Sequence, residues 1–336
     1  MGMNRPEAIA QAKWRQSQLT KPAGSLGEIE AVAVQLAGIQ KVESPDASPA
    51  AVAIFAADHP VVARRPEISA YPQDVTAAMV ANFQNGGAAA CVLAKQHGID
   101  FSVHDVGVVG GNPEYQEGAG DLSKGEAMTK DLFEKSVGAG QKVVRDLLAS
   151  FPDLRVFIPG EMGIGNTTAA SSVVGALLSM DAEAITGRGT GVAEESFRAK
   201  IETVGQALSH ADLSSPRSVV QTAGGREIAA MFGAMLEAAR ADLVILVDGF
   251  IVSSAALAAC QEEPAIRDSL LFSHRSRERG HQLVLAELEA TPLLDLDLAL
   301  GEASGALLAY PLLQSACAIH REMATFESAG VSGACS

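Results

Sequence analysis

The residues with the clearest chemical potential are an acid and a glycine-rich turn in one short run. Glu161 lies in residues 160–168 (GEMGIGNTT), between an apolar run at 154–158 and a segment rich in Ala, Ser and Val. A strand, a glycine turn and a helix in this order expose backbone N–H groups at a helix N-terminus, where an anion can bind. A carboxylate would repel a phosphate, so Glu161 is predicted to face a cation or a proton to be moved. A tight connection without a ligand is the alternative.

Two further glycine turns indicate a small phosphorylated ligand. Residues 186–191 (TGRGTG) combine bare backbone amides with hydroxyls and a guanidinium, and precede a helical pattern that carries Lys200. Residues 222–227 (TAGGRE) open another helical segment. No turn has the Gly-Lys-Ser/Thr ending of a P-loop, and the first predicted strand ends in Asp58-His59-Pro60 where a dinucleotide fingerprint would lie. These turns beside acids predict a substrate with a phosphate and a reactive polar centre.

Polar residues follow the predicted strands at the points where the strands end. In an open α/β sheet, ligands bind outside the carboxyl ends of the strands, so these residues are candidates for one shared cleft. They are Asp58, His59, Asp105, Glu161, Asp248, His274 and Glu302. The aspartates have an alternative role as helix N-caps or turn formers. The histidines have an alternative role as surface or hydrogen-bonded residues.

The elements that would position these residues alternate between short apolar strands and amphipathic helices. Several strands are nearly continuous runs of apolar residues, typical of parallel strands covered on both faces. The predicted strands are 51–57, 99–105, 154–158, 243–248, 269–273 and 294–299. The predicted helices include 74–83, 88–97, 166–180, 226–239, 249–259 and 278–289. The alternation predicts an α/β fold with a doubly wound, mostly parallel sheet. The large α/β domain is expected at 49–302, and a smaller helical lobe from both chain ends, 1–48 and 303–336.

Composition excludes several classes of function. The chain has 336 residues and a net charge of −15 without a basic cluster, which argues against nucleic-acid binding. The four cysteines are widely spaced and form no Cys-x-x-Cys pair, so neither structural zinc nor a disulfide framework is expected. The first 21 residues lack the hydrophobic core of a signal peptide, and no apolar run is long enough to span a bilayer. We therefore expect a cytoplasmic protein that does not contact membranes.

Taken together, the motifs resemble the family of nicotinate-nucleotide–dimethylbenzimidazole phosphoribosyltransferases. The resemblance runs from KPAGSLG at 21–27 to ATF at 324–326. Between these ends it is carried by ADH at 57–59, SAYPQ at 69–73, NGGAA at 85–89, HDVG at 104–107, GEMGIGNTT at 160–168, GRGTG at 187–191, DGF at 248–250 and GEASGA at 301–306. So many motifs in order over almost the whole length make the resemblance specific.

The resemblance implies transfer of phosphoribose from nicotinate mononucleotide to 5,6-dimethylbenzimidazole, by a homodimer with a Rossmann-like fold and without a metal or cofactor. It places the general base at Glu302 and a second functional acid at Glu161. The substrate-binding residues that it implies are Gly163, Gly165, Asn166, Thr167, Gly187, Arg188, Gly189, Thr190, Gly191, Lys200, Asp248, Ser69, Tyr71 and Gln73.

Departures from the family pattern concern the base that accepts the phosphoribose. Pro60 stands where the family usually has glycine, and Ala78 lies near a position where glutamine is common. Adenine, another benzimidazole or a phenol are therefore alternative acceptors in the same chemistry. More distant alternatives are an NAD-dependent dehydrogenase and a non-catalytic nucleotide-binding subunit.

Overall fold

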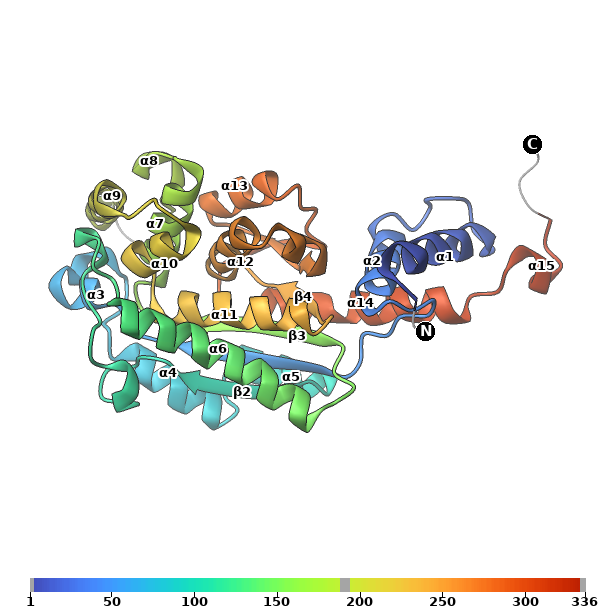
Figure 1. Cartoon of the computed structure of the whole chain (residues 1–336), viewed down its shortest axis with the longest axis horizontal. Helices are drawn as coiled ribbons and strands as arrows, with labels where there is room; N and C mark the ends of the chain where they lie inside the picture. Colours follow the sequence, from blue (N-terminus) through green and yellow to red (C-terminus); the bar gives the residue numbers. More distant parts are fainter. Residues whose placement is uncertain (1–2, 188–193, 333–336) are drawn as a thin grey trace.

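A computed structural model describes residues 3–187 and 194–332 of the chain. Of the predicted site residues, Arg188, Gly189, Thr190 and Gly191 lie outside the described residues. Figure 1 shows an α/β body that carries most of the helices, with a group of helices from both chain ends at one side.

The core of the fold is a five-stranded sheet in which every pair of neighbouring strands is parallel. The strand order is β2-β1-β3-β4-β5. The strands are β1 (Ala50–Ala56), β2 (Asp100–Asp105), β3 (Val156–Met162), β4 (Val244–Val247) and β5 (Leu270–Phe272). Because the chain starts in β1 and winds outward in both directions, the strand order reverses between β1 and β3, where doubly wound folds bind ligands. The predicted fold class is confirmed.

Strand β3 extends further than its sequence predicts. It continues through Pro159 and Gly160 to Met162, and Glu161 pairs with Phe55 of β1. Proline and glycine are depleted in strands, which is why the sequence indicated a turn at this point. Glu161 is therefore fixed by sheet pairing on a central strand, and only residues 163–165 form the turn.

The predicted strand at 294–299 is wrong as a member of the main sheet. It forms β7 (Leu294–Leu298), which pairs with the short strand β6 (His274–Ser276) in a separate two-stranded sheet. Its aspartates, Asp295 and Asp297, are exposed, so this segment could not be covered on both faces. His274 follows β5, as predicted, and it is also the first residue of β6.

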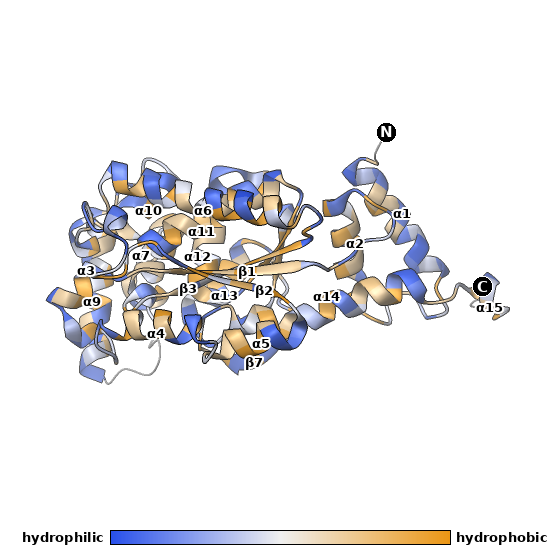
Figure 2. Ribbon diagram, turned by 90° about the horizontal axis from the view of Figure 1, so that it is seen from below, coloured by the Kyte–Doolittle hydropathy of each residue, from blue (hydrophilic) through white to orange (hydrophobic). Residues whose placement is uncertain are grey.

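Helices cover both faces of the main sheet. Figure 2 shows α4 and α5 on one side of the strands and α6 and α11 on the other, with the hydrophilic colours concentrated on their outward turns. The long helix α6, which has 21 residues, was not predicted. The helices that surround the sheet are α3 (Pro60–Arg64), α4 (Val75–Gln84), α5 (Ala89–His97), α6 (Lys130–Ser150), α7 (Asn166–Leu178), α8 (Ala182–Ile185), α9 (Glu194–His210), α10 (Pro216–Ala223), α11 (Arg226–Arg240), α12 (Phe250–Glu262) and α13 (Arg279–Glu287). The 3-10 helices are η1 (Pro66–Ile68), η2 (Pro113–Tyr115), η3 (Leu122–Lys124) and η4 (Pro264–Ser269).

The helices at the two chain ends contact one another. They are α1 (Arg5–Gln18), α2 (Glu28–Gln40), α14 (Ser304–Glu322) and α15 (Phe326–Ala329). Helix α2 packs against α1 and α14, and Arg15 donates a hydrogen bond of 2.7 Å to the carbonyl of Arg321. An antiparallel bridge joins Leu19 to Thr325. Helix α14 runs from the sheet into this group of helices (Figure 1), so one helix links the two parts of the molecule.

Replacing Gly140 by alanine is expected to lower the free energy of unfolding. Helices α6 and α11 approach so closely that a Cβ atom at Gly140 would lie 1.8 Å from the Ala230 carbonyl oxygen. Backbone cannot move aside cheaply, so we expect a loss of about 1–3 kcal/mol. Gly138 of the same helix has no atom within 4 Å of its Cβ position, and its replacement by alanine is a matched control. This control should gain about 0.5–1 kcal/mol, because alanine favours the helix. Urea unfolding measures both, and equal effects would contradict the packing argument.

Among the helices of residues 3–187 and 194–332, none is long and apolar enough to cross a membrane.

Candidate functional site

A cavity of about 80 Å³ lies at the carboxyl ends of β3 and β4. The first residues of α7 and α12 both line it, so two helix N-termini face the same space. Both helices have 13 residues, and both begin after a glycine, Gly165 and Gly249, with no side chain bonded to the first-turn amides. In α7 the amides of Asn166 and Thr168 donate to the carbonyls of Gly163 and Gly165 at 3.1 and 3.0 Å. The remaining first-turn amides and the positive ends of the two helix dipoles favour an anion at this place.

Lys200 supplies a cation near these helix ends. It comes from α9, its side chain is buried, and its Nζ donates hydrogen bonds of 2.9 Å to Thr167 Oγ1 and 3.0 Å to the Gly187 carbonyl. Burial lowers the pKa of Lys200 to about 8, although the nearby carboxylate of Glu278 opposes that shift. At pH 7 the side chain of Lys200 is therefore mainly in its charged ammonium form, and it lies beside the predicted residues Thr167 and Gly187.

Glu161, Asp248 and Glu278 are the acids that line the cavity, and Glu302 lies next to the first two. Glu161 and Asp248 line it directly together with Gly301, the neighbour of Glu302. Glu161 Oε1 accepts the backbone N–H of Glu302 at 3.3 Å, and its other oxygen accepts a hydrogen bond from the Asn166 side chain. In the described part of the chain, no group donates to the Glu302 carboxylate itself. Glu161 thus holds the backbone of Glu302 through this hydrogen bond. The side-chain carboxylate of Glu302 remains available to accept a proton.

The turn that carries Glu302 has an uncommon backbone. Gly301, Glu302 and Ala303 have φ values of 83°, 62° and 60°, three left-handed residues in succession. A non-glycine residue in this region costs about 1–3 kcal/mol and persists only where its surroundings hold it. Such strain at a buried acid is typical of functional sites, and it sets Glu302 apart from Glu161 and Asp248.

Burial and mutual repulsion raise the pKa values of two of the acids. Burial, with the charge of Asp248, raises the pKa of Glu161 to about 8 and that of Glu302 to about 7. Burial also acts to raise the pKa of Asp248, but His274 and the N–H groups of Ala306 and Gly249 outweigh it, and the pKa of Asp248 is lowered overall. At neutral pH the site therefore holds an ionised Asp248, a mainly neutral Glu161 and a Glu302 poised between its two forms.

The aspartates after β1 and β2 act as turn formers. Asp105 accepts the backbone N–H groups of Gly107, Val108 and Asn112 at 2.7–2.9 Å. Asp58 accepts the N–H of Val109 at 2.8 Å. Their alternative role from the sequence is thus the one that the geometry supports.

Both candidate histidines are buried and paired. His59 Nε2 lies 2.9 Å from Glu227 Oε1, behind the turn at Gly163 and Gly165. His274 Nε2 lies 3.5 Å from Asp248 Oδ1. Because the His274 ring lines the cavity while that of His59 lies behind its wall, only His274 belongs to the site directly.

Three predicted substrate residues lie apart from the acids. Ser69, Tyr71 and Gln73 precede α4, and in the described residues no hydrogen bond joins them to Glu161 or Glu302. Tyr71 is 52% exposed. The link between this segment and the site is Thr76, whose Oγ1 accepts the Ile164 N–H at 3.1 Å. Thr76 was missed, since a single threonine in a helical pattern carries no signal of a distant loop contact.

The departures from the family pattern have local explanations. Pro60 is the first residue of α3, a position that proline favours because its missing N–H would be unpaired there. Ala78 lies exposed on α4. Neither residue disturbs the backbone near the acids.

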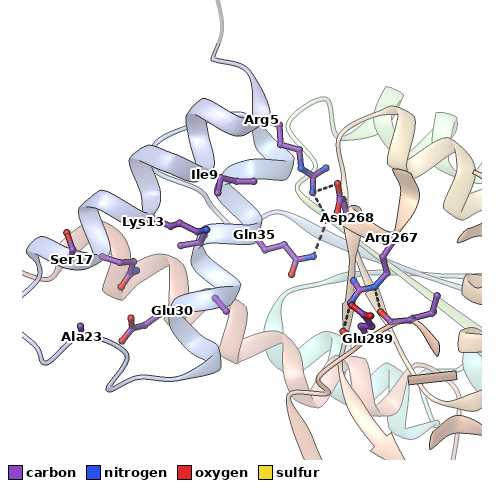
Figure 3. Close-up of a pocket in the computed structure, with 14 residues that line it drawn as sticks. Arg5, Ile9, Lys13, Ser17, Ala23, Glu30, Gln35, Arg267, Asp268 and Glu289 are labelled. Carbon is purple, nitrogen blue, oxygen red and sulfur yellow. Dashed lines mark hydrogen bonds and ion pairs between the residues drawn. The ribbon is translucent and has the colours of Figure 1, made fainter. Parts of the chain in front are cut away.

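A second, larger cleft of about 760 Å³ lies between α1, α2 and η4. Figure 3 shows Arg5 directed toward Asp268, to which it is bonded, and Arg267 bonded to the backbone carbonyls of Leu288 and Glu289. Since η4 precedes β5, this cleft is at the amino end of that strand, away from the edge where open α/β sheets bind ligands. The acids and helix ends of the smaller cavity therefore define the candidate site.

No group of three or more metal-ligating side chains is arranged around a common point in the described residues. The groups at the site include carboxylates, a lysine, the His274 imidazole and backbone amides.

The chain is similar to known phosphoribosyltransferases over nearly its full length. The sequence model of a family described as phosphoribosyltransferase matches residues 3–331. A protein of Xanthomonas axonopodis pv. citri (strain 306), named nicotinate-nucleotide–dimethylbenzimidazole phosphoribosyltransferase, is 47% identical over 329 residues, which cover 95% of this chain and 93% of that protein. A protein of the same name from Bradyrhizobium diazoefficiens is 45% identical over 328 residues, covering 94% and 92%. The crystal structure of CobT from Thermus thermophilus matches with a TM-score of 0.92 at 44% identity, covering 98% of this chain and 100% of that one.

Proposed function

Because the chain belongs to this phosphoribosyltransferase family, we propose that it transfers phosphoribose from nicotinate mononucleotide to 5,6-dimethylbenzimidazole. The products are nicotinate and α-ribazole 5′-phosphate, used in the nucleotide loop of cobalamin. The observation that carries the proposal is the full-length similarity to enzymes named for this reaction. An NAD-dependent dehydrogenase finds no such support, because the turn after β1 carries Asp58-His59-Pro60 in place of a glycine fingerprint.

Glu302 is proposed as the general base. Its carboxylate takes the N–H proton of the benzimidazole while the other ring nitrogen attacks C1′ of the ribose. The new N–C1′ bond forms as the bond from C1′ to the pyridinium nitrogen breaks, and nicotinate leaves with that electron pair. Attack opposite the leaving group turns the β-ribosidic bond into an α one. The pKa of about 7 supports this role, since a base is most efficient when its pKa lies near the working pH.

The 5′-phosphate is proposed to lie at the paired helix N-termini beside Lys200. Asn166 and Thr167 of α7, Phe250 of α12 and the Lys200 ammonium would hold it, with Gly163, Gly165 and Gly187 shaping the loops.

Glu161 is proposed as the second acid. The cationic pyridinium of the bound nucleotide would lower its raised pKa and draw it toward the ionised form, which stabilises an oxocarbenium-like transition state. Ser69, Tyr71 and Gln73 are proposed to contact the accepting base.

The activity is expected to rise with pH through a pKa of about 7. Glu302 must be ionised to accept a proton, and burial beside Asp248 raises its pKa to about 7. Below that pH, kcat/KM should therefore fall by about tenfold per pH unit. Nicotinate release at saturating base, measured from pH 5 to 9, checks this. A flat profile down to pH 5 would remove Glu302 from the role of base.

The transferase proposal is tested by mixing the protein with nicotinate mononucleotide and a panel of bases. Nicotinate release is followed by chromatography with 5,6-dimethylbenzimidazole, unsubstituted benzimidazole, adenine and phenol. Release with any base supports the chemistry, and the order of kcat/KM values identifies the acceptor. Binding of the nucleotide without release with any base would indicate a non-catalytic binding subunit.

We also propose that the chain is a cytoplasmic homodimer, divided into a lobe of residues 1–48 and 303–336 and a large domain of residues 49–302. Packing of α2 against α14 supports the division.

Three free, buried cysteines support a reducing compartment. Exposed apolar side chains on and beside β7, Leu296 and Leu300, support a protein interface. Light scattering after size exclusion tests the dimer.

A further inference from the structure

Helix α14, which directly follows Glu302, begins without a cap of its own. Its N-cap residue is Ala303, which has no side chain able to accept a hydrogen bond, and its backbone there is left-handed. The first amides of a helix have no partner within the helix, and an unmet buried N–H is destabilising. Something outside the helix must therefore satisfy them.

Asp248, from a distant part of the chain, accepts a hydrogen bond from one of these amides. Its Oδ1 accepts the N–H of Ala306 at 2.9 Å, across a separation of 58 residues. Ala306 is the third residue of α14, the position whose amide a capping side chain normally bonds. The side chain of Asp248 is buried, so this bond is shielded from water.

His274 holds Asp248 and also packs on the same helix turn. Its Nε2 is 3.5 Å from Asp248 Oδ1. A Cβ atom at Gly305 would lie 2.0 Å from His274 Cδ2, so the imidazole lies against the backbone of α14 next to the capped amide. Behind it, His281 of α13 lies at a ring-centroid distance of 6.1 Å and bonds Ser253 and Ser276. The histidine is thus fixed from behind and presents one edge to Asp248.

We infer that Asp248, oriented by His274, is a positioning residue: it caps α14 and thereby holds the strained turn that presents Glu302. This differs from the role of substrate-binding residue that the sequence predicted for Asp248. The inference rests on the proposed function, because it gives Asp248 its importance through the base. Glu161 holds the same turn from the opposite side, through the N–H of Glu302.

The charge of Asp248 has a second effect on the base. The ionisable groups that face Glu302 are Glu161 from β3, Asp248 and Cys91 of α5, and His274 faces it through Asp248. Burial and the negative charge of Asp248 together raise the pKa of Glu302. Removing that charge should lower the pKa, and the acid limb of the pH profile should then move to lower pH.

Two substitutions separate the cap from the charge. Asp248→Asn keeps an oxygen acceptor, and asparagine is an equally good N-cap, but the charge is gone. Asp248→Ala removes both. In the nicotinate-release assay, we expect Asp248→Asn to retain a higher kcat at pH 8 than Asp248→Ala, with the acid limb of its pH profile at lower pH. We expect Asp248→Ala to lose kcat by about 30-fold or more, with KM for nicotinate mononucleotide within about threefold.

The control is Asp121→Asn, which alters another buried aspartate that caps the short helix η3 through Ser123. It should leave the acid limb in place. A rise in KM with unchanged kcat in the Asp248 variants would overturn the inference. An acid limb that does not move in Asp248→Asn would refute the effect of the Asp248 charge on the base. Should Asp248→Ala fail to fold, the position of residues 301–303 in a crystal structure of Asp248→Asn still tests the capping.

An inactive wild type would refute the transferase proposal and not the capping. For that case a crystal structure of Asp248→Asn, with Asp248→Ala where it folds, provides a readout independent of turnover. We expect residues 301–303 to keep their left-handed φ values in the first variant and to lose them in the second. Movement of the turn in Asp248→Asn, or an unmoved turn in Asp248→Ala, would contradict the inference.

Discussion

Replacement of Glu302 by glutamine should lower kcat by about 10²–10⁴-fold, the usual contribution of a general base. The amide has nearly the same shape and can accept hydrogen bonds, but it cannot take the benzimidazole proton. The backbone N–H of Glu302, which is bonded to Glu161, is unchanged in the variant. The dissociation constant for nicotinate mononucleotide, measured by calorimetry, should therefore stay within about threefold of the wild-type value.

The matched control for this variant is Glu322→Gln at the other end of α14. Glu322 is exposed and pairs only with its neighbour Arg321 among the described residues, so its turnover should equal that of the wild type. If Glu302→Gln kept more than about a tenth of wild-type kcat, the base would have to be sought elsewhere. In that case Glu161→Gln is the next variant to measure, because Glu161 is the other acid at the cavity with a raised pKa.

Replacement of Lys200 by methionine should lower kcat/KM for nicotinate mononucleotide by about 100-fold, equivalent to about 3 kcal/mol. Methionine keeps the length of the side chain and removes the charge that we place beside the phosphate. The loss should appear mainly as a higher KM. Because burial lowers the pKa of Lys200 to about 8, the ammonium is present below that pH, and wild-type affinity for the nucleotide should weaken as the pH rises through 8.

Lys142→Met provides the control for Lys200. Lys142 lies on α6 with its charge paired to Asp146 at the surface, so this variant should bind the nucleotide like the wild type. A second measurement compares nicotinate mononucleotide with its dephosphorylated nucleoside. If Lys200 holds the phosphate, Lys200→Met should weaken the nucleotide strongly and the nucleoside hardly at all. Equal weakening of both ligands would refute the assignment.

The fold could be predicted from sequence wherever a strand was a continuous apolar run. Strands β1, β4 and β5 lie within about one or two residues of their predicted bounds, because burial on both faces leaves a clear run of apolar residues. The edge strand β2 (DFSVHD) is only partly buried and has no such run, although its bounds were predicted as closely. The carboxyl end of strand β3, at Met162, could not be predicted from the sequence. Pro159 and Gly160 oppose a strand in isolation, and only pairing with β1 and the close approach of Ala303 to Gly160 explain them.

The site could be predicted as a set of residues but not as a set of roles. The structure places Glu161, Asp248 and Glu302 close together, although Glu161 lies within β3 and does not follow it. The placement of acids after strands could not separate them from Asp58 and Asp105, whose carboxylates bond the amides of a local loop. Those bonds depend on loop geometry, which no strand pattern encodes. The capping bond of Asp248 joins residues 58 positions apart and leaves no local signal either.

The left-handed turn at Glu302 also fixes the order in which the molecule can become complete. All five strands of the main sheet, and with them Glu161 and Asp248, precede Glu302 in the chain, so the ribosome makes the supports before the residue that they hold. Translation adds about 5–20 residues per second, so residues 301–303 and α14 are made a few seconds after the last strand of the sheet. During that interval the two carboxylates lack the amides that they later accept. Docking of α14 is therefore the event that completes the proposed base, and a chain that stops before residue 302 would lack the centre for the transfer.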